Sequence, residues 1–126
     1  PPMTAAFADI ARTLQLYFDG LYHSDTERLR QVFHPNARYV TATGDELVDM
    51  GMDAYFPVVD KRPAPAASNQ PRQDRIVSIA MAGPKTAAVT VNCAIADRYF
   101  TDFLTLIHAD GEWRIISKVF HYDLTG

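Results

Sequence analysis

The sequence predicts an α+β fold, with helices packed on one face of a curved antiparallel sheet. Two patterns support this prediction. In the first third of the chain, apolar residues recur every three or four positions, which is the spacing of an amphipathic helix. The second half alternates apolar and polar residues, which is the period of a strand. With 126 residues, the chain is expected to form a single domain over residues 1–126.

Two helices are expected first. The longer one covers residues 4–23, and Ser24 or Asp25 then caps a second, short helix that runs to Phe33. Pro35 ends it, because a proline disfavours helical backbone in the residue before it. One apolar stripe of the longer helix is expected to face the sheet; it contains Phe7, Ile10, Leu14, Tyr17, Phe18 and Leu21.

The middle of the chain is less regular. Residues 37–43 and 46–50 are expected to form a small strand pair. Residues 52–60 have helical apolar spacing, but Pro57 within them predicts a short or broken helix. Residues 61–72 contain three prolines and are expected to form a loop.

Four longer strands follow. The last two are joined by Ala109-Asp110-Gly111, a three-residue loop with glycine where left-handed backbone is needed. If His108 faces Glu112, then Asp102 stands opposite Lys118 on one face of this hairpin. The four strands are expected at residues 74–82, 86–96, 99–108 and 112–122.

The same register surrounds this pair of charges with large apolar residues. Leu104 is expected opposite Ile116, and Phe100 opposite Phe120. Removing two charges from water costs several kcal/mol per ion, so an ion pair placed among such residues indicates an interior polar site.

The opposite face of these strands is mixed polar and aromatic. A sheet face this apolar is not expected to remain in water, so we expect a homodimer formed through it. The residues expected to form the dimer surface are Phe103, Ile107, Trp113, Ile115 and His121.

Composition excludes several classes of protein. The net charge of −3 argues against a nucleic-acid-binding module, which normally shows a basic patch. No apolar run approaches the ~18 residues of a membrane span, so no membrane partner is expected. There is no basic and apolar leader at the start, and Cys93 is the sole cysteine, so a cytoplasmic location is expected.

Three stretches of the sequence resemble a known superfamily. They are Tyr-Phe-Asp-Gly-Leu at residues 17–21, Val-Phe-His-Pro-Asn-Ala at residues 32–37, and the Asp-Gly-Glu-Trp-Arg-Ile-Ile-Ser-Lys-Val-Phe-His run at residues 110–121. Together with the order of elements, they resemble the nuclear transport factor 2-like superfamily, which has a cystatin-like α+β cone. With Thr-Asp-Phe-Leu-Thr-Leu at residues 101–106, the chain is most similar to the group labelled putative lumazine-binding proteins.

The resemblance implies a curved sheet wrapped around the N-terminal helices to form a cone with an internal pocket. It also implies dimerisation between sheets. The same cone hosts dehydratases, isomerases, cyclases, hydrolases and binding modules, so the resemblance points to a fold more than to an activity.

Each candidate catalytic residue has two interpretations. Asp102 and Lys118 form either a structural ion pair or a general base with its modulating cation. His34 is either a capping residue at the helix-to-strand junction or an acid/base partner at the pocket rim. Arg62 and two later arginines either flank the pocket entrance or are simply solvated.

The expected ligand-binding surface combines tyrosine hydroxyls with apolar side chains. Its members are Tyr17, Tyr39, Tyr55, Phe100, Leu104, Ile116 and Phe120. The four histidines are scattered and no metal-ligand spacing occurs, so no metal is expected. No phosphate loop or dinucleotide motif is present, so no cofactor is expected.

Three functions remain open from the sequence. The first is a small-molecule-binding protein whose pocket takes a mostly apolar ligand bearing an anionic or carbonyl group. The second is a cofactor-independent dehydratase, isomerase or cyclase that uses Asp102 as general base. The third is an interaction module without a ligand, which predicts a filled cone.

Overall fold

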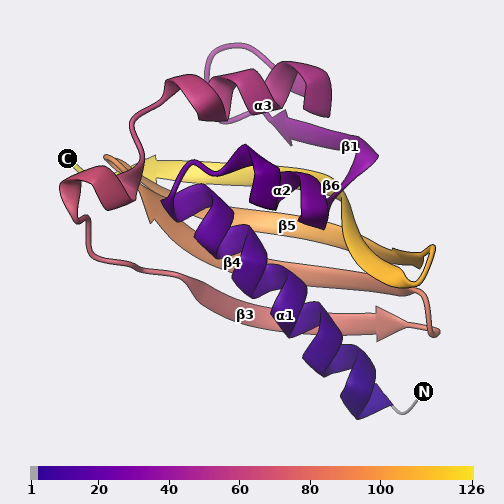
Figure 1. Ribbon diagram of the computed structural model, residues 1–126. Coiled ribbons are helices and arrows are strands. Elements are labelled where there is room, and N and C mark those ends of the chain that lie inside the picture. Colours follow the sequence, from indigo (N-terminus) through magenta and orange to yellow (C-terminus); the bar gives the residue numbers. More distant parts are fainter. Residues whose placement is uncertain (1–2) are drawn as a thin grey trace.

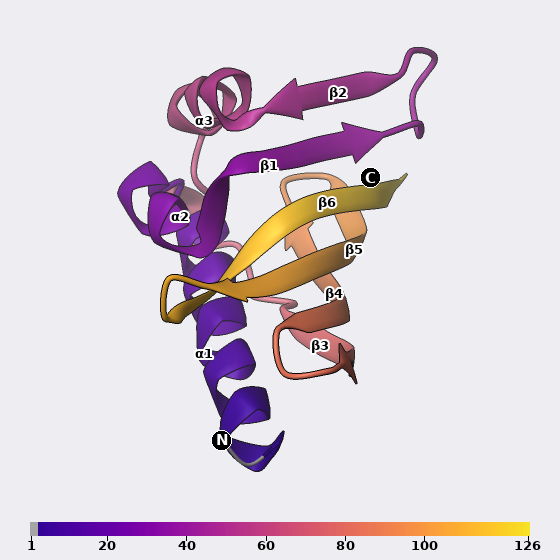
Figure 2. The same cartoon turned by 90° about the vertical axis from the view of Figure 1, so that its right-hand side faces the viewer.

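The computed structural model describes residues 3–126, in which six strands form one curved, open sheet with the helices on one of its faces (Figures 1 and 2). The α+β fold class is therefore confirmed. The helices are α1 (Met3–Tyr22), α2 (Thr26–Val32), α3 (Met52–Lys61) and the short 3-10 helix η1 (Pro65–Ser68). The strands are β1 (Phe33–Thr41), β2 (Val48–Gly51), β3 (Arg75–Ala82), β4 (Thr86–Ile95), β5 (Arg98–Ala109) and β6 (Glu112–Leu124).

The apolar stripe of α1 faces the sheet as predicted, with Ile10, Leu14 and Tyr17 fully buried. Asp25 is the N-cap of α2, since its side chain accepts a hydrogen bond from the backbone N–H of Arg28 at 3.1 Å. The two helices approach closely at Gly20, where an added Cβ would lie 2.6 Å from the Leu29 side chain.

Helix α3 is continuous over 10 residues, so of the two predicted alternatives it is the short helix and not the broken one. Pro57 lies inside it and cannot donate a hydrogen bond to the carbonyl of Asp53. Both residues are exposed, so water can satisfy that carbonyl. The apolar face of α3, which includes Tyr55 and Phe56, is buried and holds the helix against the rest of the molecule.

The sheet is mixed and not purely antiparallel. Its strand order is β2-β1-β6-β5-β4-β3, and β1 pairs with β6 in parallel while the other neighbours are antiparallel. The expectation of an antiparallel sheet was wrong at this pair. The C-terminal strand lies inside the sheet, between the early strand β1 and the late strand β5.

The predicted β5–β6 register was wrong because the turn is shorter than expected. Asp110 and Gly111 both have positive φ, at 53° and 81°, so they form the two-residue turn that aspartate-glycine favours. Ala109 therefore pairs with Glu112, and His108 with Trp113. This register turns Trp113 toward the helices.

A β-bulge in β6 then restores the predicted orientation of its second half. Thr105 pairs with Ser117 but Leu106 pairs with Ile115, which leaves Ile116 as the additional residue. Ile115 is consequently fully buried on the inner face, as is Trp113 at 6% exposure. The prediction that these two residues lie on the outer face was wrong.

The β4–β5 register differs by two positions from the one that an Asp97-Arg98 turn would give, in which Ala96 lies opposite Tyr99; the structure pairs Ala94 with Tyr99. Ala96 adopts a positive φ of 54°, and Ile95 pairs with Arg98 across the turn. Cys93 consequently lies opposite Phe100 and Val91 opposite Asp102. A shift of two keeps every side chain on its predicted face. The inner face therefore holds Val89, Val91, Cys93, Phe100, Asp102, Leu104 and Leu106, all buried.

Candidate functional site

Asp102 and Lys118 form the ion pair that the sequence suggested, in a different register. Asp102 lies opposite Phe120 and Lys118 lies opposite Leu104, so the two charged residues are diagonal neighbours on β5 and β6. Lys118 Nζ lies 3.6 Å from Asp102 Oδ2. Asp102 is 0% and Lys118 2% exposed, so both charges are removed from water.

Tyr17 connects this pair to helix α1. Its hydroxyl donates a hydrogen bond of 2.5 Å to Asp102 Oδ2. Burial, and then the negative charge of Asp102, raise the pKa of the Tyr17 hydroxyl well above its ordinary value. The hydroxyl therefore keeps its proton and remains a hydrogen-bond donor to the carboxylate.

Aromatic rings surround the Lys118 ammonium. The distance from Nζ to each ring centroid is 5.3 Å for Tyr17, 5.3 Å for Tyr39, 6.0 Å for Tyr55, 5.6 Å for Phe100 and 5.0 Å for Phe120. Each face carries negative charge density that attracts a cation. Burial alone would lower the pKa of Lys118, but the Asp102 carboxylate and the smaller contributions of Tyr55, Tyr39 and Cys93 together outweigh it, so the pKa is raised. Lys118 is therefore held as an ammonium ion.

Most of the expected ligand-binding residues lie around this pair. Tyr17 and Tyr55 are fully buried, Tyr39 is partly buried and stacks on Tyr55 at 4.3 Å between centroids. Leu104 is buried beside the pair, on the same face. Ile116 is the exception. It was predicted to lie opposite Leu104, but it is the additional residue of the bulge, and Lys118 lies opposite Leu104 instead.

Two buried polar atoms at this pair have no hydrogen-bond partner among the described residues: Oδ1 of Asp102 and the hydroxyl of Tyr55, whose ring faces Lys118. Nε and Nη2 of Arg62, the residue after α3, are also buried without a partner among the described residues. A buried polar group without a partner costs free energy, so such atoms point to a binding site or to bound water. From the sequence, Arg62 either flanks the pocket entrance or is solvated, and no local signal distinguishes the two interpretations.

His34 is not brought near Asp102. Its Nδ1 accepts a hydrogen bond of 3.0 Å from the backbone N–H of Asn36, two residues further along β1. It lines a hollow of about 220 Å³ with Ala109, Asp110 and Arg114 at the turn of the β5–β6 hairpin. Ala109 is seven positions from Asp102 along β5, roughly 20 Å at the rise of a strand.

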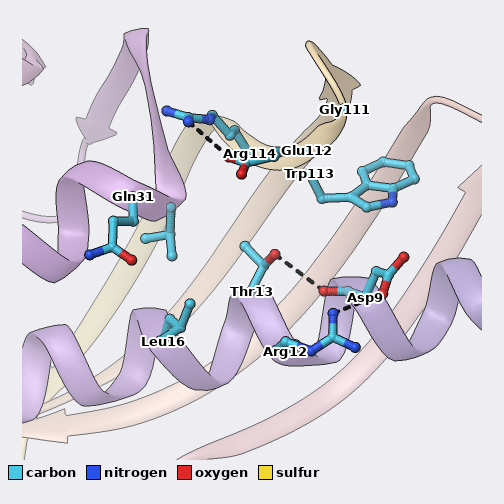
Figure 3. Close-up of a pocket in the computed structure, with 10 residues that line it drawn as sticks. Asp9, Arg12, Thr13, Leu16, Gln31, Gly111, Glu112, Trp113 and Arg114 are labelled. Carbon is cyan, nitrogen blue, oxygen red and sulfur yellow. Dashed lines mark hydrogen bonds and ion pairs between the residues drawn. The ribbon is translucent and has the colours of Figure 1, made fainter.

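A larger hollow of about 490 Å³ lies between α1 and the same hairpin (Figure 3). Its charged residues pair with their own neighbours: Arg12 with Asp9 at 2.8 Å, and Arg114 with Glu112 at 2.9 Å. Neither hollow is lined by Asp102 or Lys118. The buried ion pair is therefore a separate site, closed to solvent.

Two further features of the described residues concern metals and membranes. Between residues 3 and 126, there is no group of three or more histidine, cysteine or acidic side chains that could hold a metal ion. None of the helices in this range is long and apolar enough to cross a membrane.

The thiol of Cys93 is buried, and this burial, with the nearby charge of Asp102, raises its pKa to about 12. It is therefore a packing residue and not a nucleophile.

Comparisons with known proteins agree with this fold. The family model described as "Putative lumazine-binding" matches residues 5–121. "Aldolase FrzH" from Cladobotryum sp is 25% identical over 114 residues, which cover 89% of this chain and 87% of that protein.

Solved structures with the same fold cover nearly the whole chain. An NTF-2 like protein of unknown function from Silicibacter pomeroyi DSS-3 has a TM-score of 0.86 at 25% identity, covering 98% of this chain and 100% of that one. An ntf2-like protein from Shewanella baltica OS155 has a TM-score of 0.87 at 23% identity, covering 98% of each chain. The chain therefore belongs to the "Putative lumazine-binding" family, within the nuclear transport factor 2-like superfamily.

Proposed function

We propose that the chain binds a mostly apolar small molecule bearing a carbonyl group between the sheet and the helices, and that Asp102 removes a proton from the carbon next to that carbonyl. The observation that carries this proposal is the state of the Asp102 carboxylate. Tyr17 and Lys118 engage Oδ2, whereas Oδ1 is buried and has no partner among the described residues. An oriented carboxylate with one free oxygen can act as a general base.

The step can be written with the groups present. The C–H bond breaks, its proton goes to Oδ1 of Asp102, and its electron pair forms the double bond of an enolate whose negative charge rests on the former carbonyl oxygen. The buried hydroxyl of Tyr55, which has no acceptor among the described residues, supports hydrogen-bond donation to that oxygen. No cofactor is needed for this step.

Lys118 acts here as a fixed positive charge. A lysine that forms an imine with a carbonyl must first be a neutral amine, and the raised pKa of Lys118 opposes that. Its ammonium instead holds the Asp102 carboxylate in place. The proposal is therefore of non-covalent acid–base chemistry.

The name of one relative supports this reaction class. Aldol reactions proceed through the same enol or enolate that proton removal next to a carbonyl creates, and the relative from Cladobotryum sp is named an aldolase. Ligand entry requires the side chains around the pair to separate. Tyr39 is the least buried of the tyrosines around Lys118, which favours entry beside it.

We also propose that the outer sheet face forms a homodimer with a second copy of the chain. The helices lie on the other face, which leaves this one uncovered in the chain (Figure 2). Phe103 is 63% and Val119 47% exposed there, opposite each other on β5 and β6. Ile107 and His121 stay in the proposed surface, while the buried Trp113 and Ile115 do not.

The reaction is tested by isotope exchange. The methyl ester of phenylpyruvate is incubated in heavy water, and exchange of the protons next to its ketone is followed by NMR. The wild type is expected to accelerate exchange, and Asp102→Asn to reduce that acceleration by about a hundredfold or more. Asp49→Asn, a surface carboxylate change, is the matched control and keeps the wild-type rate.

The two remaining functions are separate outcomes of the same experiment. Binding of the ester without accelerated exchange would show that the chain is a ligand-binding protein and does not catalyse the proposed proton removal. Neither binding nor exchange would favour the interaction module, whose cone is filled by its own side chains.

A further inference from the structure

We propose that Arg62 is the receptor for a carboxylate on the bound molecule, so that the substrate class is carbonyl compounds that also carry a carboxylate. This inference rests on the proposed function, because it assigns the second end of the same ligand. It begins from Arg62, a partly exposed residue whose guanidinium has two buried nitrogens without a partner among the described residues.

Two nitrogens of Arg62 are buried and unsatisfied. Nε and Nη2 each have almost no accessible surface and no hydrogen-bond partner among residues 3–126. Over the same range, Arg62 forms no ion pair with a carboxylate, whereas Arg72 is paired with both Asp19 and Asp74. A buried guanidinium N–H without an acceptor costs free energy, so these two donors need a partner.

The two unsatisfied nitrogens are the pair that recognises a carboxylate. Nε–H and Nη2–H point in parallel from one edge of the guanidinium plane, which matches the two oxygens of a carboxylate. This chain uses the same edge elsewhere: Arg38 directs Nε and Nη2 at Asp49 Oδ1, at 3.0 and 2.7 Å. On Arg62 the two nitrogens of the corresponding edge are buried and have no acceptor among residues 3–126.

The end of helix α3 fixes where Arg62 points. Arg62 is the first residue beyond the helix, and its backbone N–H donates to the Val58 carbonyl at 3.2 Å. Its φ of −84° and ψ of 147° are extended, which ends the helix just before Pro63. The backbone at Arg62 is therefore held by the end of the helix.

The charge of Arg62 reaches the same interior as Asp102. Burial raises the pKa of both the Tyr39 hydroxyl and the Cys93 thiol, and the positive charge of Arg62 opposes that increase at each. Asp102 acts on the same two groups with the opposite sign. Arg62 and Asp102 therefore both lie within electrostatic reach of Tyr39 and Cys93.

Lys118 and Arg62 differ in whether they are free to bind an anionic group of a ligand. Lys118 is committed to Asp102 and to the surrounding aromatic rings, so it has little to offer a ligand anion. Arg62 has no such partner among the described residues. A bound keto acid would therefore place its carboxylate at Arg62 and its carbonyl toward Asp102 and Tyr55.

The test measures binding and not turnover. Acetate, benzoate and phenylpyruvate, each with its methyl ester, are titrated calorimetrically against the wild type, Arg62→Gln, Arg62→Lys and the exposed matched control Arg75→Gln. Arg62→Gln is expected to weaken binding of phenylpyruvate about tenfold or more and to leave its ester unchanged. Arg62→Lys keeps the charge without the parallel donors, so it should restore binding only in part.

Each result has a defined meaning. Equal losses for acid and ester, an unchanged affinity in Arg62→Gln, or an equal effect of Arg75→Gln would overturn the assignment. Failure of every acid to bind the wild type would do so as well. The proposed reaction can fail independently of this assignment. In that case Asp102→Asn exchanges protons as fast as the wild type, while Arg62→Gln still binds phenylpyruvate more weakly and its ester equally well. Arg62 would then remain the carboxylate receptor, and Asp102 would not be the general base.

Discussion

The hydroxyl of Tyr17 and Oδ2 of Asp102 lie 2.5 Å apart, so helix α1 is hydrogen-bonded directly to the middle of β5 across the buried interior. The same oxygen lies 3.6 Å from Lys118 on β6. One carboxylate oxygen thus holds a helix and a neighbouring strand, and the other has no hydrogen-bond partner among residues 3–126. Stability and the proposed chemistry are therefore combined in a single side chain.

The Tyr17 hydroxyl should contribute measurably to stability. Tyr17→Phe removes only that oxygen, and a hydrogen bond to a charged group is worth about 1.5–3 kcal/mol, so the free energy of unfolding should fall by that amount. Urea denaturation measures it. Tyr22→Phe is the control, since its hydroxyl donates at 2.7 Å to the uncharged carbonyl of Gln70 and should cost about 1 kcal/mol. Equal losses in the two variants would contradict a charged bond at Tyr17.

Removing one member of the buried ion pair should cost more than removing both. Asp102→Asn leaves the Lys118 ammonium buried without its partner, and such a change costs about 3–5 kcal/mol. The double variant with Asp102→Leu and Lys118→Met replaces both charges with apolar groups and should be less destabilised than either single charge removal. Chemical denaturation of Asp102→Leu, Lys118→Met and the double variant checks this, and simple additivity of the two single losses would refute it.

Alkaline pH should destabilise the fold in part through Cys93. Its pKa is raised to about 12 in the folded chain from an ordinary value near 9, so between these values the unfolded state loses the thiol proton first. The unfolded state then binds fewer protons, and the free energy of unfolding falls as pH rises. Cys93→Val should remove a few kcal/mol of this dependence across that window, measured by urea denaturation at several pH values. An unchanged pH slope would contradict it.

Two aspartate substitutions separate the outer face from the core. Phe103→Asp should leave the chain folded and convert the proposed dimer to a monomer in sedimentation, because Phe103 is exposed on the uncovered face. Trp113→Asp should instead destabilise the fold by about 3–5 kcal/mol or more, because Trp113 is buried. A Phe103→Asp protein with the wild-type sedimenting mass would refute the dimer proposal.

Much of the inner face could be predicted from alternation alone. Phe100, Asp102 and Leu104 are on one face of β5 because the strand has a period of two, and a register error of two residues leaves that unchanged. The Asp110-Gly111 turn was also predictable, since that dipeptide favours a two-residue hairpin turn. A three-residue loop would instead pair His108 with Glu112, and that register places Trp113 and Ile115 on the outer face.

Other features have no local signal in the sequence. Nothing about Ile116 itself marks it as the additional residue of a bulge; the bulge is set by the turn on one side and by burial of Lys118 and Phe120 on the other. The parallel pairing of β1 with β6 joins segments far apart in the chain. The inward orientation of Arg62 likewise depends on where α3 packs, which is a tertiary property.

The position of β6 has a consequence for how the chain folds. During synthesis β1 and β2 emerge first and β3, β4 and β5 follow, yet in the strand order β6 separates these two groups. They cannot join into one sheet until residues 112–124 have been made. Lys118 arrives on that same strand, so Asp102 has no counter-ion until then. A nascent chain that stops before β6 should therefore expose two unpaired sheet edges, which are sites for aggregation or for chaperone binding.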